Sequence, residues 1–477
     1  MKEVLKNNQL KENLSLPKHI HLVGAGGVHM SAIGQILISK GHILSGSDLA
    51  SSGYTEKLKE LGAKIFLGHN SDNIGQAELL VATAAIKTDN PELIAANKKS
   101  IPIMLRAEMI QLLTKEYELI AIAGSHGKTT TTGLTALMLE KSQLDPLVLL
   151  GGNAPDLGGN LKIGFGKYAV IEADEYAEAF LQYRAKIALI TNIEIDHLDY
   201  YKSQENLYKA FKQFSEQIIS SGLLIISIDS PLASDLKSEY ESLGKTVETY
   251  SIEKNDATWS ARNLRANEIG GLSSNIFLEG RYLGEISLPI PGRHNMSNAI
   301  GALAVAMRAG VDFNRAASVI QNFSGITRHF EVIGESLIFE KPITIVDDYA
   351  HHPTEVRATV SAAKQKYGKR RLVACFQPHT FSRSEYLLAQ WRHCFERIDK
   401  LFMLSTYAAR ETPEDGIDAK QLSSAISSPK PIDLESLDSA AKIIVESLQP
   451  GDVFLTLGAG DVTNLGPAVM KLLERRK

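Results

Sequence analysis

The sequence predicts an α/β protein with three domains, each built around a mainly parallel sheet. Three observations support this fold class. Short apolar runs of strand length alternate along the chain with segments of helical periodicity. Many of these runs end in glycine turns, acidic residues or histidines, which is where ligands bind in open parallel sheets. The length of 477 residues also fits about three domains.

The spacing of these runs divides the chain at two points. We expect a Rossmann-like domain at residues 17–115, a central domain at 116–325 and a second Rossmann-like domain at 326–477. The polar segment Thr114–Glu118 is a plausible linker. The pieces around Trp259–Pro289 are shorter and alternate with polar residues, which is typical of antiparallel strands.

The composition is that of an ordinary globular protein, with 44% hydrophobic and 22% charged residues. The net charge of −4 and the lack of a Lys/Arg block argue against nucleic-acid binding. No apolar run is long enough to insert in a membrane, and the polar first residues do not resemble a signal peptide. The only two cysteines, Cys375 and Cys394, are expected to be buried thiols. We therefore expect a cytoplasmic enzyme.

The first glycine turn follows the predicted strand His19–Val23 and reads GAGGVHM. The dinucleotide fingerprint G-x-G-x-x-G requires a third glycine where this chain has His29. Asp48 follows the next predicted strand, His42–Gly46, at the place of a ribose-binding acid. The pattern favours a nucleotide diphosphate, either nicotinamide or another, over a tight turn without a ligand.

The most informative segment is residues 119–135, LIAIAGSHGKTTTTGLT. An apolar strand enters the loop Gly124–Gly127, and Lys128 and the threonines Thr129–Thr132 begin an amphipathic helix. Glycines let backbone N–H groups approach oxyanions, a lysine reaches terminal phosphates, and a threonine hydroxyl can contact magnesium. The loop is two residues shorter than the common P-loop, whose first glycine would be at Ile122. We favour a phosphate site over a simple helix N-cap, because four threonines are poor helix formers.

Two further strand ends are predicted near this loop. Glu172 lies at the end of an apolar strand in EADE, and His197 follows the next strand in TNIEIDH. They could face each other across neighbouring strand ends beside Lys128, where a carboxylate near phosphates suits Mg²⁺. Taken alone, His197 is more typical of a structural histidine, and Asp174 and Glu175 could equally be solvated or cap the next helix.

The third domain repeats this arrangement in the segment ITIVDDYAHHPTEV. Asp347 and Asp348 leave the predicted strand Ile343–Val346. Either aspartate alone could cap a turn, but two beside a tyrosine and two histidines suggest a binding site. The next strand exit, FQPHTFSR, offers His379 and Arg383. Because arginine can hold a carboxylate bidentately, we expect a small carboxylate-bearing co-substrate here; the alternative is a loop with a surface arginine.

Together these motifs resemble those of the Mur ligase family, over about residues 18–470. They occur in the order GAGGVHMSAI with SGSD, GSHGKTTTT, EADE, TNIEIDH, PGRHN, FSGITRHFE, VDDYAHHPTE, FQPHTFSR, YAARE and LGAGD. The segments VDDYAHHPTE and FQPH are similar to those of the branch that adds L-alanine to UDP-N-acetylmuramate. The branch that attaches a peptide to the same acceptor in muropeptide recycling shares a similar aspartate-histidine segment but not FQPHTFSR.

The resemblance implies an N-terminal domain that binds UDP-N-acetylmuramate, a central P-loop-type ATPase domain, and a C-terminal domain that closes over ATP and L-alanine. It implies Mg²⁺ as a cofactor, a monomer or homodimer, and a role in peptidoglycan precursor synthesis. ATP would phosphorylate the muramate carboxylate, and the amine of L-alanine would attack the acyl phosphate. A nucleotide-gated ATPase switch and a nicotinamide-dependent oxidoreductase are the alternatives from other classes.

The resemblance also assigns roles to individual residues. ATP is expected at Gly124, Ser125, His126, Gly127, Lys128, Thr129, Thr130, Asn295, Asn298, Arg328 and Asp348. The metal is expected on Thr129, Glu172 and His197. The UDP-sugar is expected at Gly26, Gly27, Val28, His29, Ser47, Asp48 and Arg106. L-alanine and the closing domain are expected to involve Tyr349, His351, His379 and Arg383. The residues expected to take part in the chemistry are Lys128, Glu172, His197, His351 and Arg383.

Three places depart from the family pattern. Tyr176-Ala177-Glu178-Ala179 stands where many members have a serine–aspartate pair. His329 replaces a common second arginine, and Thr380 stands where other members have arginine. The first departure puts a substrate contact in question, and at Thr380 we expect an alanine or phosphate contact to be missing or supplied by another residue.

Overall fold

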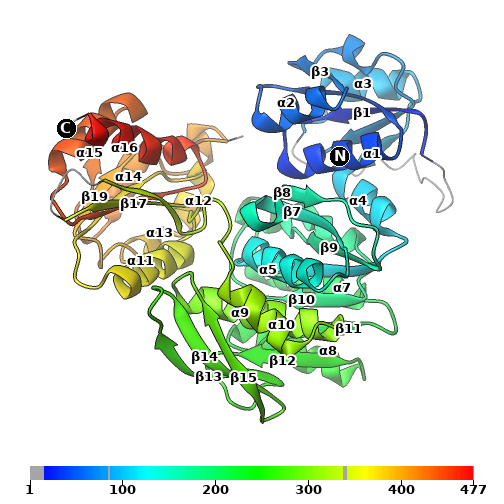
Figure 1. Cartoon of the computed structure of the whole chain (residues 1–477). Helices are drawn as coiled ribbons and strands as arrows, with labels where there is room; N and C mark the ends of the chain where they lie inside the picture. Colours follow the sequence, from blue (N-terminus) through cyan, green and yellow to red (C-terminus); the bar gives the residue numbers. More distant parts are fainter. Residues whose placement is uncertain (1–15, 84–85, 337–340, 410, 476–477) are drawn as a thin grey trace.

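The computed structural model describes residues 16–83, 86–336, 341–409 and 411–475. These residues form three α/β units, each with its own sheet, as the sequence predicts (Figure 1). The N-terminal unit, in blue, stands at one end of the central cyan-to-green unit, and the yellow-to-red C-terminal unit lies beside it. Within the described residues, no helix combines the length and hydropathy needed to cross a membrane.

The N-terminal sheet has the strand order β3-β2-β1-β4-β5, and all of its pairings are parallel. This is the order of a Rossmann-like half with its switch point beside β1. Its strands are β1 (His19–Val23), β2 (Ile43–Asp48), β3 (Lys64–Leu67), β4 (Leu79–Ala82) and β5 (Ile103–Leu105). Its helices are α1 (Val28–Ser39), α2 (Gly53–Glu60), α3 (Pro91–Lys98) and α4 (Arg106–Thr114). Strand β2 is longer than predicted, so Ser47 and Asp48 belong to the strand itself.

The central sheet has ten strands in the order β15-β14-β13-β12-β11-β10-β6-β9-β7-β8. Strand β6 (Glu118–Ala123) lies between β10 (Ile187–Ile190) and β9 (Tyr168–Glu172). The prediction that Glu172 and His197 extend from neighbouring strands was therefore wrong, because β6 separates them. The remaining strands are β7 (Leu147–Ala154), β8 (Gly159–Lys162), β11 (Leu223–Ser227), β12 (Val247–Ser251), β13 (Trp259–Ala266), β14 (Leu272–Leu278) and β15 (Arg281–Leu288). The pairings β13–β14 and β14–β15 are antiparallel, as predicted.

The helix after the phosphate loop, α5 (Lys128–Lys141), is buried on all sides from Thr130 to Leu139. The expectation of an amphipathic helix was wrong, because α9 (Arg293–Arg308) and α10 (Phe313–Gln321) cover the face turned away from the sheet. Two of the threonines satisfy their buried hydroxyls within the helix. Thr131 Oγ1 donates to Gly127 O at 2.9 Å, and Thr132 Oγ1 donates to Lys128 O at 2.8 Å.

The other helices of the central unit connect its strands. They are η2 (Pro155–Leu157), η3 (Tyr176–Gln182), α6 (Leu198–Tyr201), α7 (Gln204–Glu216) and α8 (Pro231–Ser242). Helix α9 begins five residues before the predicted start at Asn298, so Asn295 lies in its first turn.

The C-terminal sheet has the order β16-β17-β21-β18-β19-β20, with only the edge strand β16 antiparallel. Its strands are β16 (Glu331–Ser336), β17 (Ile343–Asp348), β18 (Leu372–Phe376), β19 (Lys400–Met403), β20 (Ile432–Asp433) and β21 (Val453–Leu457). Helix α11 (Pro353–Tyr367) follows β17. Further helices are α12 (Phe381–Tyr386), α13 (Leu388–Trp391), α14 (Ala419–Ala425), α15 (Leu437–Ser447) and α16 (Leu465–Glu474). Cys375 and Cys394 are buried and free, as predicted.

Helix α9 packs so closely on the central sheet that Gly301 has little room for a side chain. A Cβ at this position would lie 3.0 Å from Leu189 Cδ1 and 3.0 Å from Tyr250 Cζ. We expect Gly301→Val to lower the free energy of unfolding by about 1–3 kcal/mol, because valine overpacks this contact. Chemical denaturation measures the change, and Gly53→Ala, which meets nothing within 4 Å, is the control. Equal stability of the two variants would contradict the packing argument.

Candidate active site

The phosphate loop after β6 requires glycine at both of its ends. Gly124 and Gly127 have φ values of +138° and +80°. A Cβ on Gly124 would lie 1.9 Å from Thr191 Oγ1, and one on Gly127 would lie 2.3 Å from Asn298 Oδ1. The loop is a backbone cradle that side chains would fill, which fits a bound phosphate chain.

Lys128 points back along this loop. Its Nζ donates to Gly124 O at 2.5 Å and to Ser125 O at 3.1 Å, and lies 2.8 Å from Glu175 Oε2. Burial alone would lower the pKa of Lys128, but the carboxylates of Glu175 and Glu172 raise it above its ordinary value. Glu175 is buried, so the alternative that it is a solvated residue was wrong. The sequence analysis did not predict that Glu175 pairs with Lys128, because the acidic motif EADE resembles an exposed polar loop.

The predicted metal ligands are only partly brought together. Thr129 Oγ1 donates to Glu172 Oε1 at 3.1 Å, and Gly151 N donates to Glu172 Oε2 at 2.8 Å. Burial raises the pKa of Glu172, although Lys128 lowers it. His197 instead lies with its Nε2 at 3.6 Å from Glu175 Oε1. The hydroxyl and carboxylate oxygens of Thr129 and Glu172 are ligands that Mg²⁺ accepts.

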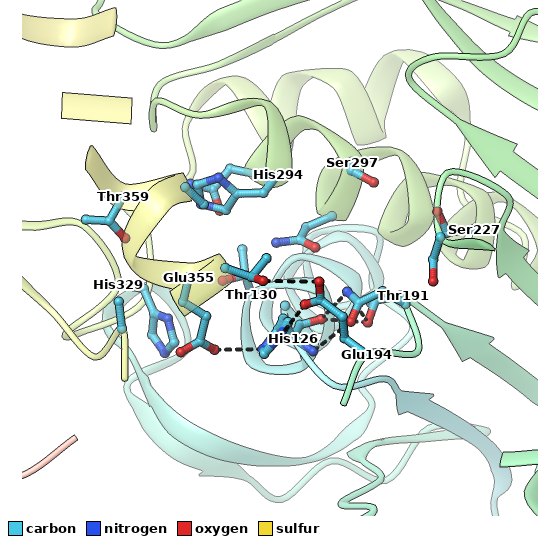
Figure 2. Close-up of a pocket in the computed structure, with 18 of the residues that line it drawn as sticks. His126, Thr130, Thr191, Glu194, Ser227, His294, Ser297, His329, Glu355 and Thr359 are labelled. Atoms are coloured by element: carbon cyan, nitrogen blue, oxygen red, sulfur yellow. Dashed lines mark hydrogen bonds and ion pairs between the residues drawn. The ribbon is translucent and has the colours of Figure 1, made fainter. Parts of the chain in front are cut away.

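A cavity of about 360 Å³ lies between the central and C-terminal units, next to the loop (Figure 2). Its volume falls in the range of small-molecule sites. Six of the predicted ATP-site residues line it: His126, Gly127, Thr130, Asn295, Asn298 and Asp348. Sequence reasoning missed Ser227, the last residue of β11, and Asp229 and Ser230 just after it, which line the same cavity. The exit of that parallel strand, reading SIDSP, was the available signal.

Asp348 and Arg328 were both expected at the ATP site, but the structure places them differently. Burial raises the pKa of Asp348 to about 7, although the N–H groups of Ala350 and Phe330 donate to its carboxylate. Arg328 is not among the described residues that line the cavity. Its guanidinium donates to Gly458 O at 2.7 Å and lies 3.3 Å from Asp347.

The residues predicted for the amino-acid pocket form a row on the C-terminal unit. The ring centroids of Tyr349 and His351 are 5.2 Å apart, and those of His351 and His379 are 5.5 Å apart. Arg383 Nη1 lies 3.0 Å from His379 Nδ1. The same guanidinium contacts Asp196 of the central unit through Nη2 at 2.9 Å and Nε at 3.1 Å. Arg383 is therefore not the surface arginine of the alternative interpretation, and its charge already has one carboxylate partner.

The N-terminal turn, expected at the UDP-sugar site, makes two intramolecular contacts through its backbone. Gly26 N donates to Asp48 Oδ2 at 2.8 Å, and a Cβ on Gly26 would lie 2.9 Å from that oxygen. Val28 O accepts from Asn160 Nδ2 of the central unit at 3.0 Å, and Gly27 is the N-cap of α1. These contacts place the turn at the junction of the first two units.

The other residues predicted for the UDP-sugar are more deeply placed. Ser47 is fully buried and donates to Glu92 Oε2 at 2.7 Å. Arg106 pairs with Asp174 of the central unit at 2.9 Å. Burial, together with the nearby Arg106, lowers the pKa of His29 to about 3. Glu92 and Asp174 were not predicted as partners because each lies far along the chain from the residue it contacts.

His126 contacts two carboxylates from different units (Figure 2). Its Nε2 lies 2.9 Å from Glu194 Oε2, and its Nδ1 lies 3.0 Å from Glu355 Oε1. Burial alone would lower the pKa of His126, but Glu355 and Glu194 raise it to about 10. The two carboxylates therefore favour the charged form of the imidazole.

Comparison with known proteins gives consistent matches along the chain. Residues 19–118 match a family described as Mur ligase family, catalytic domain, residues 122–306 match the Mur ligase middle domain, and residues 328–460 match the Mur ligase, glutamate ligase domain. A UDP-N-acetylmuramate–L-alanine ligase of Alkaliphilus metalliredigens is 42% identical over 93% of this chain and 95% of its own. One of Pelotomaculum thermopropionicum is 39% identical over 96% of this chain and 98% of its own. The chain belongs to the Mur ligase family.

Solved structures agree with this assignment. The UDP-N-acetylmuramate–alanine ligase of Thermotoga maritima has a TM-score of 0.82 and 28% identity, over 96% of this Mur ligase and 100% of that chain. A murein peptide ligase of Psychrobacter arcticus has the same fold, with a TM-score of 0.73 and 23% identity, over 96% and 99% of the two chains.

The three departures from the family pattern have distinct structural settings in this Mur ligase. Ala177 and Glu178 have φ values of 54° and 60°, a left-handed backbone that is unfavourable for both. The Tyr176 ring lies 5.1 Å from the His197 ring. His329 lines the cavity, and Thr380 is buried at the start of α12 with φ of 65°.

The ion pairs of His126 predict a pH dependence of the stability of this Mur ligase. A raised pKa contributes stability that is complete below the ordinary value of 6.5 and is lost as the pH rises to about 10. We expect the thermal unfolding midpoint to fall across this range, and we expect His126→Gln to flatten the fall. His393→Gln removes an exposed pair with Glu396 and should keep the wild-type slope. An unchanged slope in His126→Gln would contradict the assignment.

Proposed function

We propose that this Mur ligase uses ATP to join L-alanine to the carboxylate of UDP-N-acetylmuramate in peptidoglycan precursor synthesis. The observation that carries the proposal is the glycine cradle with Lys128, which lies directly beside a nucleoside-sized cavity. Relatives named for this reaction match nearly the whole chain, which supports the choice of substrates. Cytoplasm is the proposed location, and the sequence-based limits at residues 115/116 and 325/326 are the proposed domain boundaries.

The proposed nucleotide site extends from the loop into the cavity. Backbone N–H groups of the loop and the Lys128 ammonium face the phosphates, and Asn295 and Asn298 of α9 face the base or ribose. Thr129 and Glu172 would hold Mg²⁺ through their oxygen atoms. His197, the third expected ligand, instead lies beside Glu175, so it would join the metal only by leaving that carboxylate. When bound, Mg²⁺ neutralises charge on the phosphate oxygens.

The chemical step needs activation because a carboxylate is a poor electrophile. In the proposed reaction the muramate carboxylate attacks the γ-phosphate of ATP and ADP leaves. The amine of L-alanine then attacks the acyl carbon, and phosphate leaves as the amide forms. The contribution of the chain is to position these groups and to stabilise negative charge, with Lys128 nearest the transferred group.

The proposed amino-acid pocket is the row Tyr349, His351 and His379 together with Arg383. Because Asp196 already contacts two nitrogen atoms of Arg383, Nη1 is the atom best placed to meet a substrate carboxylate. The bridge to Asp196 also links the row to the central unit, so the pocket is complete only when the two units are together.

An amino-acid panel tests the proposed reaction. The purified chain is incubated with ATP, Mg²⁺, UDP-N-acetylmuramate and single amino acids, and both ADP and the product mass are measured. We expect ADP formation to require UDP-N-acetylmuramate and L-alanine together, with weaker activity for serine and glycine, which differ from alanine by one small group. ADP release without the two substrates would favour an ATPase switch, and activity only with a peptide would favour the recycling branch.

Lys128→Ala tests the cradle. We expect kcat to fall by a factor of about 100 or more, because the variant loses a cation at the transferred phosphate. Circular dichroism and the unfolding midpoint check that the fold remains. Lys141→Ala, at the distant end of the same helix, should keep wild-type activity. Ligase activity retained in Lys128→Ala would reject the cradle assignment.

A further inference from the structure

We propose that His126 is a positioning residue through which the C-terminal domain sets the geometry of the phosphate loop, by its ion pair with Glu355. The inference rests on the proposed ligase function. In this proposal the imidazole of His126 contacts the C-terminal domain, while the backbone N–H groups of the loop face the phosphates.

The backbone of His126 is fixed to the central unit. Its N–H donates to Asn192 Oδ1 at 3.0 Å, and its carbonyl accepts from Thr191 Oγ1 at 2.6 Å and from Asn192 Nδ2 at 3.0 Å. The imidazole extends from this fixed backbone to the boundary between the two units, where it lies between Glu194 and Glu355 (Figure 2). The ring is therefore joined to the phosphate loop by a short connection, and in the proposed coupling Glu355 acts on the loop at this point.

Glu355 is in turn fixed to the start of α11. Its Oε1 contacts His126, while its Oε2 accepts from the backbone N–H groups of His351 and His352 at 3.0 and 3.2 Å. The second set of bonds is a capping box, which ties the carboxylate to the first turn of the helix. Glu355 therefore cannot move relative to α11 without breaking the cap. Its carboxylate moves together with the C-terminal domain.

Further contacts align the same boundary. Thr354 Oγ1 donates to Glu194 Oε1 at 3.1 Å, and His352 Nε2 lies 3.1 Å from Ile195 O. The ring centroids of His126 and His352 are 4.7 Å apart. Glu194 and Glu355 would face each other across the boundary without a cation between them, so loss of the imidazolium would oppose closure.

This arrangement couples two parts of the reaction. His351 of the proposed amino-acid row lies two residues before α11 and donates its backbone N–H to Glu355, so a domain position that forms the row also brings Glu355 to His126. The phosphate loop and the amino-acid pocket then reach their working geometry together. ATP binding to the central unit alone does not need the pair.

Two neutral substitutions and their combination test the coupling. His126→Gln and Glu355→Gln each remove one charge, and glutamine at position 355 can keep the capping box. For each variant and the double variant we would measure kcat and KM for L-alanine, the Kd of a non-hydrolysable ATP analogue, and the radius of gyration with that analogue bound. His393→Gln, on an exposed histidine–glutamate pair, is the matched control.

We expect kcat/KM for L-alanine to fall roughly tenfold or more in each single variant, while the Kd of the analogue changes by less than about threefold. The radius of gyration should increase, and the double variant should be no worse than His126→Gln alone. If His126→Gln does not fold, Glu355→Gln provides the same comparison.

Losses that multiply in the double variant, or a loss confined to the Kd of the analogue, would overturn the coupling. Wild-type values in both single variants would do the same. Failure of the proposed function would be visible separately, as a wild-type protein that forms no alanine adduct. The radius of gyration and the analogue Kd would still test the link between the domains in that case.

Discussion

Strands β6 and β10 and helix α9 meet at the bend Gly124–Gly127, at distances that leave no room for a side chain. Gly124 faces Thr191 at the end of β10, and Gly127 faces Asn298 in the first turns of α9. One short segment of backbone thus fixes the phosphate-facing N–H groups relative to the cavity beside them. This close approach needs both the strand order of the central sheet and the burial of α5. A different strand order, or an α5 exposed to solvent, would separate the three elements.

Several charged side chains around this bend are paired, and the most informative pairs cross domain boundaries. Lys128 pairs with Glu175 within the central unit, whereas His126 with Glu355 and Arg383 with Asp196 join it to the C-terminal unit. Removing one partner of a buried pair leaves an uncompensated charge, which is strongly destabilising. The arrangement of the domains and the geometry of the site therefore depend on the same interactions.

Backbone strain is also concentrated near the site. Ala177, Glu178, His197 and Thr380 all have positive φ without being glycine. Such conformations cost about 1–3 kcal/mol each and persist only where the surroundings enforce them. The ring contact between Tyr176 and His197 and the buried position of Thr380 are among the interactions that do so here.

The sequence by itself determined the local elements of this Mur ligase. Strands β1 and β21 and the glycine bend were predicted because each depends on residues close together in the chain. Apolar runs specify strands, glycines specify positive φ, and strand exits gather polar residues at one edge of a sheet.

Only the tertiary structure decided which charges meet. The sequence did not show that β6 separates Glu172 from His197, that Glu175 pairs with Lys128, or that Arg383 is already held by Asp196. It also gave α5 a solvent face, which α9 and α10 cover in the folded chain. These facts depend on strand order and domain packing, which bring residues up to 229 positions apart into contact, as for His126 and Glu355. Local periodicity carries no information about such partners, because the physical cause of each pair is burial created by the whole fold.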